Sequence, residues 1–178
     1  LGSHSPVGSP SQLIRIYWSL SPEGAIAVMN SLTQKFNDAK LPFSFKVLYN
    51  PSDYVRHDSG VLYFDNHHYE SVRPILQSIY TEHQAHFHQE IPLFTKLLAP
   101  GLGLAEEPTQ KFEIVESFGM NRCQIVANGL LLAQEKADNS VEGRIKSILE
   151  QFSLLGINLQ HPYINAESSD IYSPLNLI

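Results

Sequence analysis

Five cations of this chain stand in apolar or turn-rich surroundings, where solvent should be scarce. They are Arg15, Lys46, Arg56, Lys96 and Arg122. Burial beside other cations favours the neutral form of a lysine, so a lysine among them could serve as a base. Arginines beside a helix N-terminus form a seat for a phosphate or a carboxylate. Together these residue types describe a site that holds a phosphate and removes a nearby proton.

The same cations could instead form internal ion pairs. Five carboxylates are available as partners, namely Asp53, Asp58, Glu106, Glu107 and Glu116. Spacing along the chain does not decide between an anion site and a set of ion pairs.

Alternating side chains predict two strands that carry these cations. In residues 13–19, Arg15 and Tyr17 fall on one face and an apolar set falls on the other. In residues 43–50, Lys46 lies on the face opposite to a row of aromatic and aliphatic side chains. Each strand therefore has one apolar face and one face that carries candidate functional side chains.

The segment between these strands predicts a helix. The run Ser-Pro-Glu at 21–23 is typical of a helix start, and the helix should extend to about Ala39. A strand, a helix and a second strand suggest a right-handed parallel crossover. If the helix covers the apolar faces, then Arg15, Tyr17 and Lys46 share the opposite face of the sheet.

The remaining chain continues this pattern. Residues 60–65 predict a third strand, antiparallel to the second, and residues 69–90, 120–136 and 141–155 predict helices. Residues 94–108 are rich in Gly and Pro and predict irregular structure.

The predicted fold class is therefore α+β, in a single domain that spans residues 13–178. It has a small mixed β-sheet, with strands near 13–19, 43–50 and 60–65, packed with about four helices. Residues 1–12 are rich in Gly, Ser and Pro and are interpreted as a flexible lead-in or a cloning remnant.

Composition excludes several classes of partner. The 178 residues hold 12 Lys plus Arg against 18 Asp plus Glu, a formal net charge of -6. Such a chain has no basic field for nucleic acid or an anionic membrane. No signal peptide is recognised, and the single Cys123 cannot form an internal disulfide. We expect a cytoplasmic protein, or one secreted into a host cell without a signal peptide.

Other kinds of site have weak support. His83 and His86 lie three residues apart, but no HExxH motif is present, and we expect no metal site. Ser117 and Cys123 lack a recognisable nucleophile setting. The glycines at 100–104 lack the spacing of a nucleotide-binding loop.

Three long motifs add a resemblance to these observations. They are FKVLYNPSDYVRHDSGVLYF, PLFTKLLAPGLGLAEEP and ESFGMNRCQIVANGL, preceded by YWSLSPEGA and followed by HPYINA. Over about residues 13 to 170 the chain resembles the HopA-type effector family, known from type III secretion and from gene clusters that make modified peptides such as lanthipeptides. More remotely, that family resembles the phosphothreonine lyases, which eliminate phosphate from phosphothreonine or phosphoserine to leave a dehydroamino acid.

The resemblance implies a role for each candidate residue. Lys46 would be the base, while Arg56 and Arg122, joined by Arg15, would bind the phosphate. Lys96 is a further candidate for phosphate binding. Phosphothreonine lyases use a histidine as the acid, where this chain offers Tyr17, with Tyr49 as the second candidate. The supporting candidates are Asp53, Asp58 and Glu116.

This chemistry would need no metal and no cofactor, because cations on both sides offset the developing charge. The implied partners are a phosphorylated peptide or protein, and a kinase-like protein or a secretion chaperone. The competing hypothesis is a module without catalysis that binds a protein partner or a phosphopeptide. The missing histidine favours that hypothesis, and the set of cations on one sheet face opposes it.

Overall fold

A five-stranded antiparallel sheet forms the centre of the fold in the computed structural model, which describes residues 11–176. The strands are β1 (Leu13–Trp18), β2 (Ser44–Val47), β3 (Gly60–Asp65), β4 (Lys96–Ala99) and β5 (Leu102–Glu106). Their order across the sheet is β2-β3-β1-β5-β4. With its helices packed around this sheet, the fold is α+β, as predicted.

The predicted strand-helix-strand unit is present, with β3 inserted between its two strands. β1 and β2 are each antiparallel to β3, so they run in the same direction without being neighbours. The sheet differs here from the expected mixed sheet, since every neighbouring pair of the described strands is antiparallel. The cause is the loop at 48–59, which turns the chain back so that β3 pairs with both strands.

The segment expected to be irregular forms a hairpin instead, so that prediction is wrong. β4 and β5 pair antiparallel around a tight turn. Gly101, in this turn, has φ of +73°, a conformation that glycine adopts without a steric penalty. Gly and Pro therefore mark the turn between two short strands here, not a long loop.

Four α-helices complete the fold: α1 (Pro22–Asp38), α2 (Tyr69–His83), α3 (Phe118–Glu135) and α4 (Val141–Leu154). Single turns of 3-10 helix lie at Pro51–Val55, Asn66–His68 and Gln84–His86. α1 begins as predicted, because the Ser21 side chain accepts a hydrogen bond from the Gly24 N–H at 3.1 Å.

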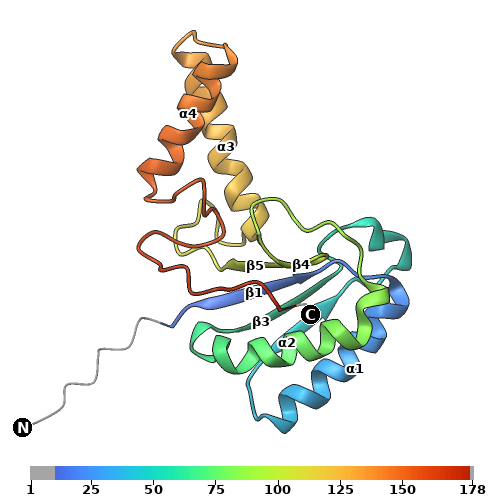
Figure 1. The fold of residues 1–178 in the computed structure, drawn as a ribbon. Helices are drawn as coiled ribbons and strands as arrows, with labels where there is room; N and C mark the ends of the chain where they lie inside the picture. The colour runs from blue at the N-terminus through green and yellow to red at the C-terminus, as the bar shows by residue number, and fades with distance from the viewer. Residues whose placement is uncertain (1–10, 177–178) are drawn as a thin grey trace, which may run out of the picture.

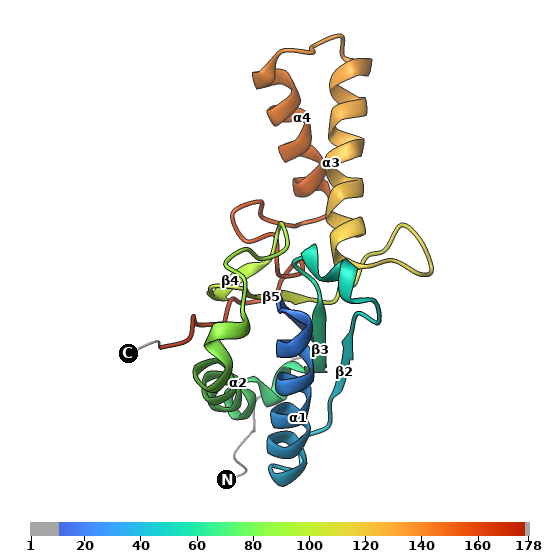
Figure 2. The same ribbon diagram turned by 90° about the vertical axis from the view of Figure 1, so that its right-hand side faces the viewer.

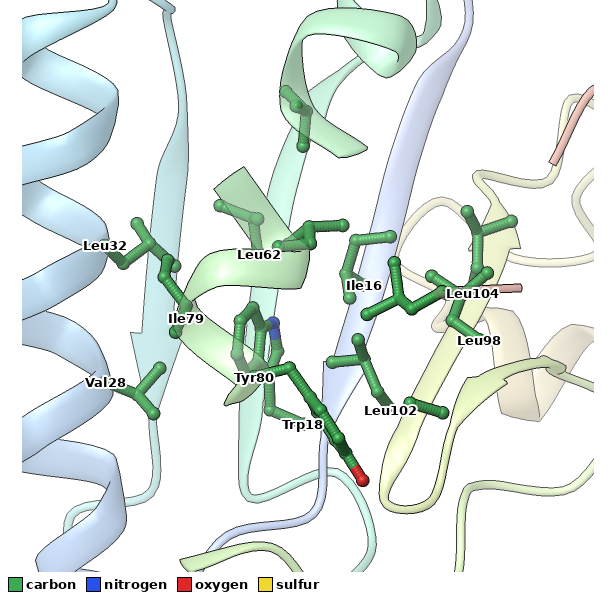
Figure 3. Packing of buried hydrophobic residues seen from close by; sticks show 14 of the residues in the cluster. Ile16, Trp18, Val28, Leu32, Leu62, Ile79, Tyr80, Leu98, Leu102 and Leu104 are labelled. Carbon is green, nitrogen blue, oxygen red and sulfur yellow. The ribbon is translucent and has the colours of Figure 1, made fainter. Parts of the chain in front are cut away.

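α1 and α2 cover one face of the sheet (Figure 1). The core between them is built from apolar side chains of both helices and of four strands. Those labelled in Figure 3 are Ile16, Trp18, Val28, Leu32, Leu62, Ile79, Tyr80, Leu98, Leu102 and Leu104. Because this layer buries the apolar faces of β1 and β2, the residues that alternate with them are directed to the other face.

α3 and α4 form a hairpin that projects from this other side of the sheet (Figures 1 and 2). The two helices approach closely at Gly129, where a Cβ atom would lie 2.5 Å from Cα of Ile148. The hairpin leaves apolar side chains exposed along its length, such as Leu131 and Ile145. Only the first turn of α3 lies at the sheet.

The chain after α4 wraps around the edge of the sheet. Glu106 N–H donates to the Tyr163 carbonyl at 2.8 Å, and Leu175 N–H donates to the Leu98 carbonyl at 2.8 Å. At the other end of the chain, most of the predicted lead-in lies outside the described residues, and Gln12 N–H already binds the Asn66 side chain at 3.2 Å. None of the helices within residues 11–176 combines the length and the apolar character of a membrane span.

Candidate functional site

The registers of three strands place the predicted catalytic residues on one face of the sheet. Tyr17 pairs with Val61 across β1 and β3, and Lys46 pairs with the same Val61 across β2 and β3. Arg15 pairs with Tyr63 two residues further along. Since paired residues point to the same side of a sheet, Lys46, Tyr17 and Arg15 share the face opposite α1 and α2, as the alternation predicted.

These side chains line a cavity of about 110 Å³. Lys46 and Tyr17 stand on the strands either side of β3, so their Cα atoms are about 10 Å apart at normal strand spacing. Val61 lies between them, and residues 92–93 and 117–119 close the walls. Because small-molecule pockets usually exceed about 300 Å³, this cavity suits a small chemical group or a single side chain better than a whole cofactor.

The ring of Tyr63 contacts both Arg15 and Lys46. Cζ of Arg15 lies 5.3 Å from the ring centroid, and Nζ of Lys46 lies 5.4 Å from it. Both distances are within the range of a cation-π interaction. Lys46 is nevertheless exposed, so the expectation that solvent is scarce around it is not met.

Arg15 is a permanent cation that already has an anionic partner. Its guanidinium binds the Glu107 carboxylate, which also accepts a hydrogen bond from Lys111 at 2.6 Å. Burial lowers the pKa of Arg15, but Tyr17, Glu107 and Tyr63 outweigh burial, and the net pKa is raised. A bound phosphate would therefore share Arg15 with Glu107.

Tyr17 is the buried member of the cavity, with 6% of its surface exposed. Burial raises the pKa of its phenol to about 12, although Arg15 acts in the opposite direction. Its ring packs against Phe118, with the centroids 6.4 Å apart. The phenol therefore keeps its proton at neutral pH and is available as a donor.

The first turn of α3 contributes positive charge density to the cavity wall. The Ser117 side chain caps this helix by accepting the Met120 N–H at 3.2 Å. Phe118 and Gly119 line the cavity, and the N–H groups at the start of a helix have no partner within the helix. A Cβ atom at Gly119 would meet nothing within 4 Å, so the backbone is open there. Such a helix start favours anions.

Arg56 does not line the cavity but pairs with a residue that does. It is exposed and donates two hydrogen bonds to the Asp58 carboxylate, at 2.9 and 2.8 Å. Asp58 itself lines the cavity. The structure therefore brings Arg56 to the site through Asp58.

Arg122 is not brought to the cavity. Its side chain is 0% exposed and donates to the carbonyls of Pro162 and Ile164, at 2.7 and 3.2 Å. It also donates to the Asn121 side chain at 2.6 Å. Burial lowers the pKa of Arg122 to about 10, which leaves it charged at neutral pH. In this conformation it fastens the segment after α4 to α3.

Lys96 is also held away from the cavity. Its ammonium binds Asp170 and lies 5.1 Å from the centroid of the Tyr163 ring. Asp170 additionally accepts a hydrogen bond from the Tyr163 hydroxyl at 2.6 Å. Lys96 therefore also secures the chain after α4.

The three other candidates are scattered. Tyr49 is fully exposed and borders a groove on the α1 side of the sheet. Asp53 lies exposed in the 3-10 turn after β2. Glu116 is buried and accepts from the Asn121 side chain at 2.9 Å. None of these three lines the cavity with Lys46.

A metal site and a catalytic triad both have little geometric support. Residues 11–176 contain no group of three or more His, Cys, Asp or Glu that could hold a metal ion. Ser31 lies 2.8 Å from Nε2 of His83, and Glu82 lies 3.6 Å from that same nitrogen. A catalytic triad needs the acid on the other ring nitrogen, so this cluster lacks the required arrangement.

Comparison with known proteins identifies the family of the chain. The model of the HopA1 effector protein family matches residues 3–164. The chain belongs to the HopA1 effector protein family. Curated proteins gave no match.

Two solved structures share the HopA1-family fold. One is the effector protein from Pseudomonas syringae pv. tomato strain DC3000, with a TM-score of 0.65 and 17% identity over 89% of this chain. The other is the effector protein from Pseudomonas syringae pv. syringae strain 61, with a TM-score of 0.66 and 16% identity over 90% of this chain. The match spans 59% of each of those chains. At this identity the likeness concerns the fold.

Sequence reasoning missed part of the site of this HopA1-family chain. Tyr63 was not singled out, although its place in the alternation of residues 60–65 puts it on the face of Val61. Ser117 was considered only as a nucleophile, yet Ser before Phe-Gly-Met is the N-cap signal that locates the start of α3. Glu107 was named only as a general ion-pair partner, and its pairing with Arg15 could not be read before β5 was known.

Proposed function

We propose that this domain eliminates phosphate from a phosphothreonine or phosphoserine side chain of a peptide, leaving a dehydroamino acid. The observation that carries the proposal is the convergence of Lys46, Tyr17 and Arg15 on one small cavity, closed by the N-terminus of α3. A base, a proton donor and an anion seat are the groups that this elimination needs.

In the proposed step, Lys46 takes the proton from Cα of the phosphorylated residue. The electrons of the broken C–H bond become the Cα=Cβ double bond. The Cβ–O bond breaks, and its electron pair leaves with the phosphate oxygen. Lys46 accepts this proton on the lone pair of its uncharged amine.

Tyr17 is the proposed acid toward the leaving phosphate. Its phenol is protonated at neutral pH, and it stands across Val61 from Lys46. Arg15 and the N–H groups of the first turn of α3 would hold the phosphate and offset its charge. The proposal departs from the phosphothreonine lyases in using a tyrosine, since the cavity lining in the described chain includes no histidine.

A second candidate function is phosphopeptide binding without elimination. Two observations favour it: Lys46 is exposed, and Arg15 is already paired with Glu107. An exposed lysine is a common ligand for a phosphate, and an arginine that shares its charge with a carboxylate offsets less of the charge that develops during elimination. Both candidate functions bind the same phosphopeptide, but only elimination converts it to a product.

The cellular setting follows from the family. Two relatives by fold are effector proteins of Pseudomonas syringae. By analogy we place this domain among effectors delivered into a host cell, where a phosphorylated protein would be its substrate. In a biosynthetic setting, a kinase-like partner would have to install the phosphate first.

The test is to follow phosphothreonine and phosphoserine peptides by intact mass, with wild-type protein and with Lys46→Ala. Loss of phosphoric acid with wild-type protein, abolished in Lys46→Ala, is the expected result. Lys136→Ala is the matched control, because Lys136 is exposed and paired with Glu150 at 2.6 Å on the distant hairpin. If a peptide binds only when phosphorylated but never changes mass, binding without elimination is the function.

A further inference from the structure

An apolar groove of about 680 Å³ lies between α1 and the end of β2. Its walls include Ala25, Ile26 and Met29 from α1, and Val47, Leu48 and Tyr54 from the chain around β2. Ile26 is 75% exposed within it. A concave groove with mostly apolar walls and a volume of this size is typical of a ligand-binding site.

The groove continues around the end of the sheet. A second hollow, of about 420 Å³, shares Pro22, Pro51 and Tyr54 with the groove. It extends past Val55 and His57 to His88 and Glu90. The shared residues make the two hollows one path.

Residues close in sequence border the second hollow and the cation cavity, in two segments of the chain. His57 borders the second hollow and Asp58, the next residue, lines the cavity. Glu90 borders the second hollow, and Pro92 lines the cavity two residues later. The strip that joins them is held at the end of the sheet, because His88 N–H donates to the Ser19 carbonyl at 2.9 Å.

We infer that the substrate peptide lies along this path, with its phosphorylated residue in the cation cavity and an apolar side chain several residues away in the groove. The inference rests on the proposed function for the phosphate end. Shared residues join the apolar groove to the second hollow, and sequence neighbours join the second hollow to the cavity, so the apolar wall and the anion seat lie at the two ends of this series. A peptide with a phosphate and a distant apolar residue matches both ends.

This placement predicts specificity. An extended chain advances about 3.3 to 3.6 Å per residue, so only a narrow range of spacings between the two residues can reach both ends at once. Leu, Met or Phe should be preferred at that spacing, while charged residues should be rejected by the walls of the groove.

The experiment measures binding of fluorescent phosphothreonine peptides to Lys46→Ala protein, in which turnover is blocked, by anisotropy. A single Leu is moved from three to nine residues from the phosphothreonine, on either side, in a chain of Gly and Ser. We expect roughly tenfold tighter binding at one or two spacings on one side, from burial of one apolar side chain. With wild-type protein, the same spacing should lower KM and leave kcat unchanged.

Ile26→Glu should abolish the tenfold gain. Ile145→Glu is the matched control and should preserve the gain, since Ile145 is an exposed isoleucine of α4, a helix on the other side of the sheet from α1. Equal binding at every spacing overturns the inference, as does a gain that persists without the phosphate. Elimination from the peptide without Leu reports on the proposed function alone, so failure of either idea is recognised separately.

Discussion

Lys46 and Arg15 approach the ring of Tyr63 from the two strands that flank its own strand. Nζ of Lys46 and Cζ of Arg15 lie 5.4 and 5.3 Å from the centroid of Tyr63. The strand of Tyr63 lies between the strands of the two cations. The ring therefore positions the proposed base and the proposed phosphate ligand relative to each other.

Removing the aromatic ring of Tyr63 should lower turnover more than removing its hydroxyl group alone. Tyr63→Leu removes two cation-π contacts of about 0.5 to 1 kcal/mol each, and we expect kcat/KM to fall roughly fivefold to thirtyfold. Tyr63→Phe keeps the ring and should stay within about twofold of wild type. Elimination from a phosphothreonine peptide is the measurement, and equal activity of the two variants would contradict the role of the ring.

Tyr17→Phe tests the proposed acid. Loss of a general acid typically costs about 10² to 10⁴ in rate. The fall should appear in kcat, whereas phosphopeptide binding should change little because Arg15 and the start of α3 remain. In wild-type protein, a pKa of about 12 keeps the phenol protonated, so no loss of activity should arise from Tyr17 between pH 7 and pH 10. A kcat for Tyr17→Phe within a few-fold of wild type would assign the proton transfer to another group.

Buried tyrosines should make the fold unstable in alkali. Burial raises the pKa of Tyr17 and of Tyr69 to about 12, above the value of about 10 in an unfolded chain. The folded state thus keeps these protons longer, so the contribution of these two tyrosines to the free energy of unfolding is constant well below pH 10 and falls as pH rises toward 12. Each tyrosine should contribute a loss on the order of 2 kcal/mol.

Urea unfolding at intervals from pH 8 to pH 12 measures this loss. Tyr69→Phe should lower stability at pH 8, because its hydroxyl donates to the Ser173 carbonyl at 3.1 Å, and should flatten the fall above pH 10. Tyr49→Phe, at a fully exposed position, should leave the curve of wild type unchanged. A wild-type stability that does not vary between pH 10 and pH 12 would refute the prediction.

Two arginines that were both expected to bind phosphate should behave differently. Arg122→Met leaves the carbonyls of Pro162 and Ile164 without their donor and should cost about 3 kcal/mol of unfolding free energy. Arg56→Met removes only an exposed ion pair with Asp58 and should cost less than about 1 kcal/mol. Denaturant unfolding gives both values. A stable Arg122→Met protein with impaired phosphopeptide binding would return Arg122 to the list of ligands.

Local patterns were sufficient for much of the site. Period-two alternation put Arg15, Tyr17 and Lys46 on one face, and the register of β1, β2 and β3 confirms it. The cap at 21–23 located α1, which covers the other face. Alternation succeeds here because an apolar layer on one face dictates which way each side chain points.

The predictions that the structure contradicts concern contacts between segments that are distant in the sequence. Arg122 lies near a helix start, as predicted, but the segment at 161–165 that covers it comes forty residues later, so its burial could not be foreseen. The exposure of Lys46 likewise depends on what lies above the sheet. In the β4–β5 hairpin, two strands of four and five residues around Pro100 and Gly101 were too short for their alternation to outweigh the turn residues.

That hairpin rests on Gly101, and Gly101→Ala should be among the most damaging single changes to a small residue. φ at this position is +73°, which costs an alanine about 1 to 2 kcal/mol. The added Cβ atom would also lie 2.2 Å from the His88 carbonyl oxygen, so the strip that borders the proposed peptide path must move. We expect a loss of at least about 2 kcal/mol in denaturant unfolding. Gly119→Ala is the matched control, because its Cβ atom would meet nothing within 4 Å and alanine is the better helix former by about 1 kcal/mol. If both variants unfold at the denaturant concentration of wild type, the turn tolerates a side chain and the hairpin does not depend on glycine.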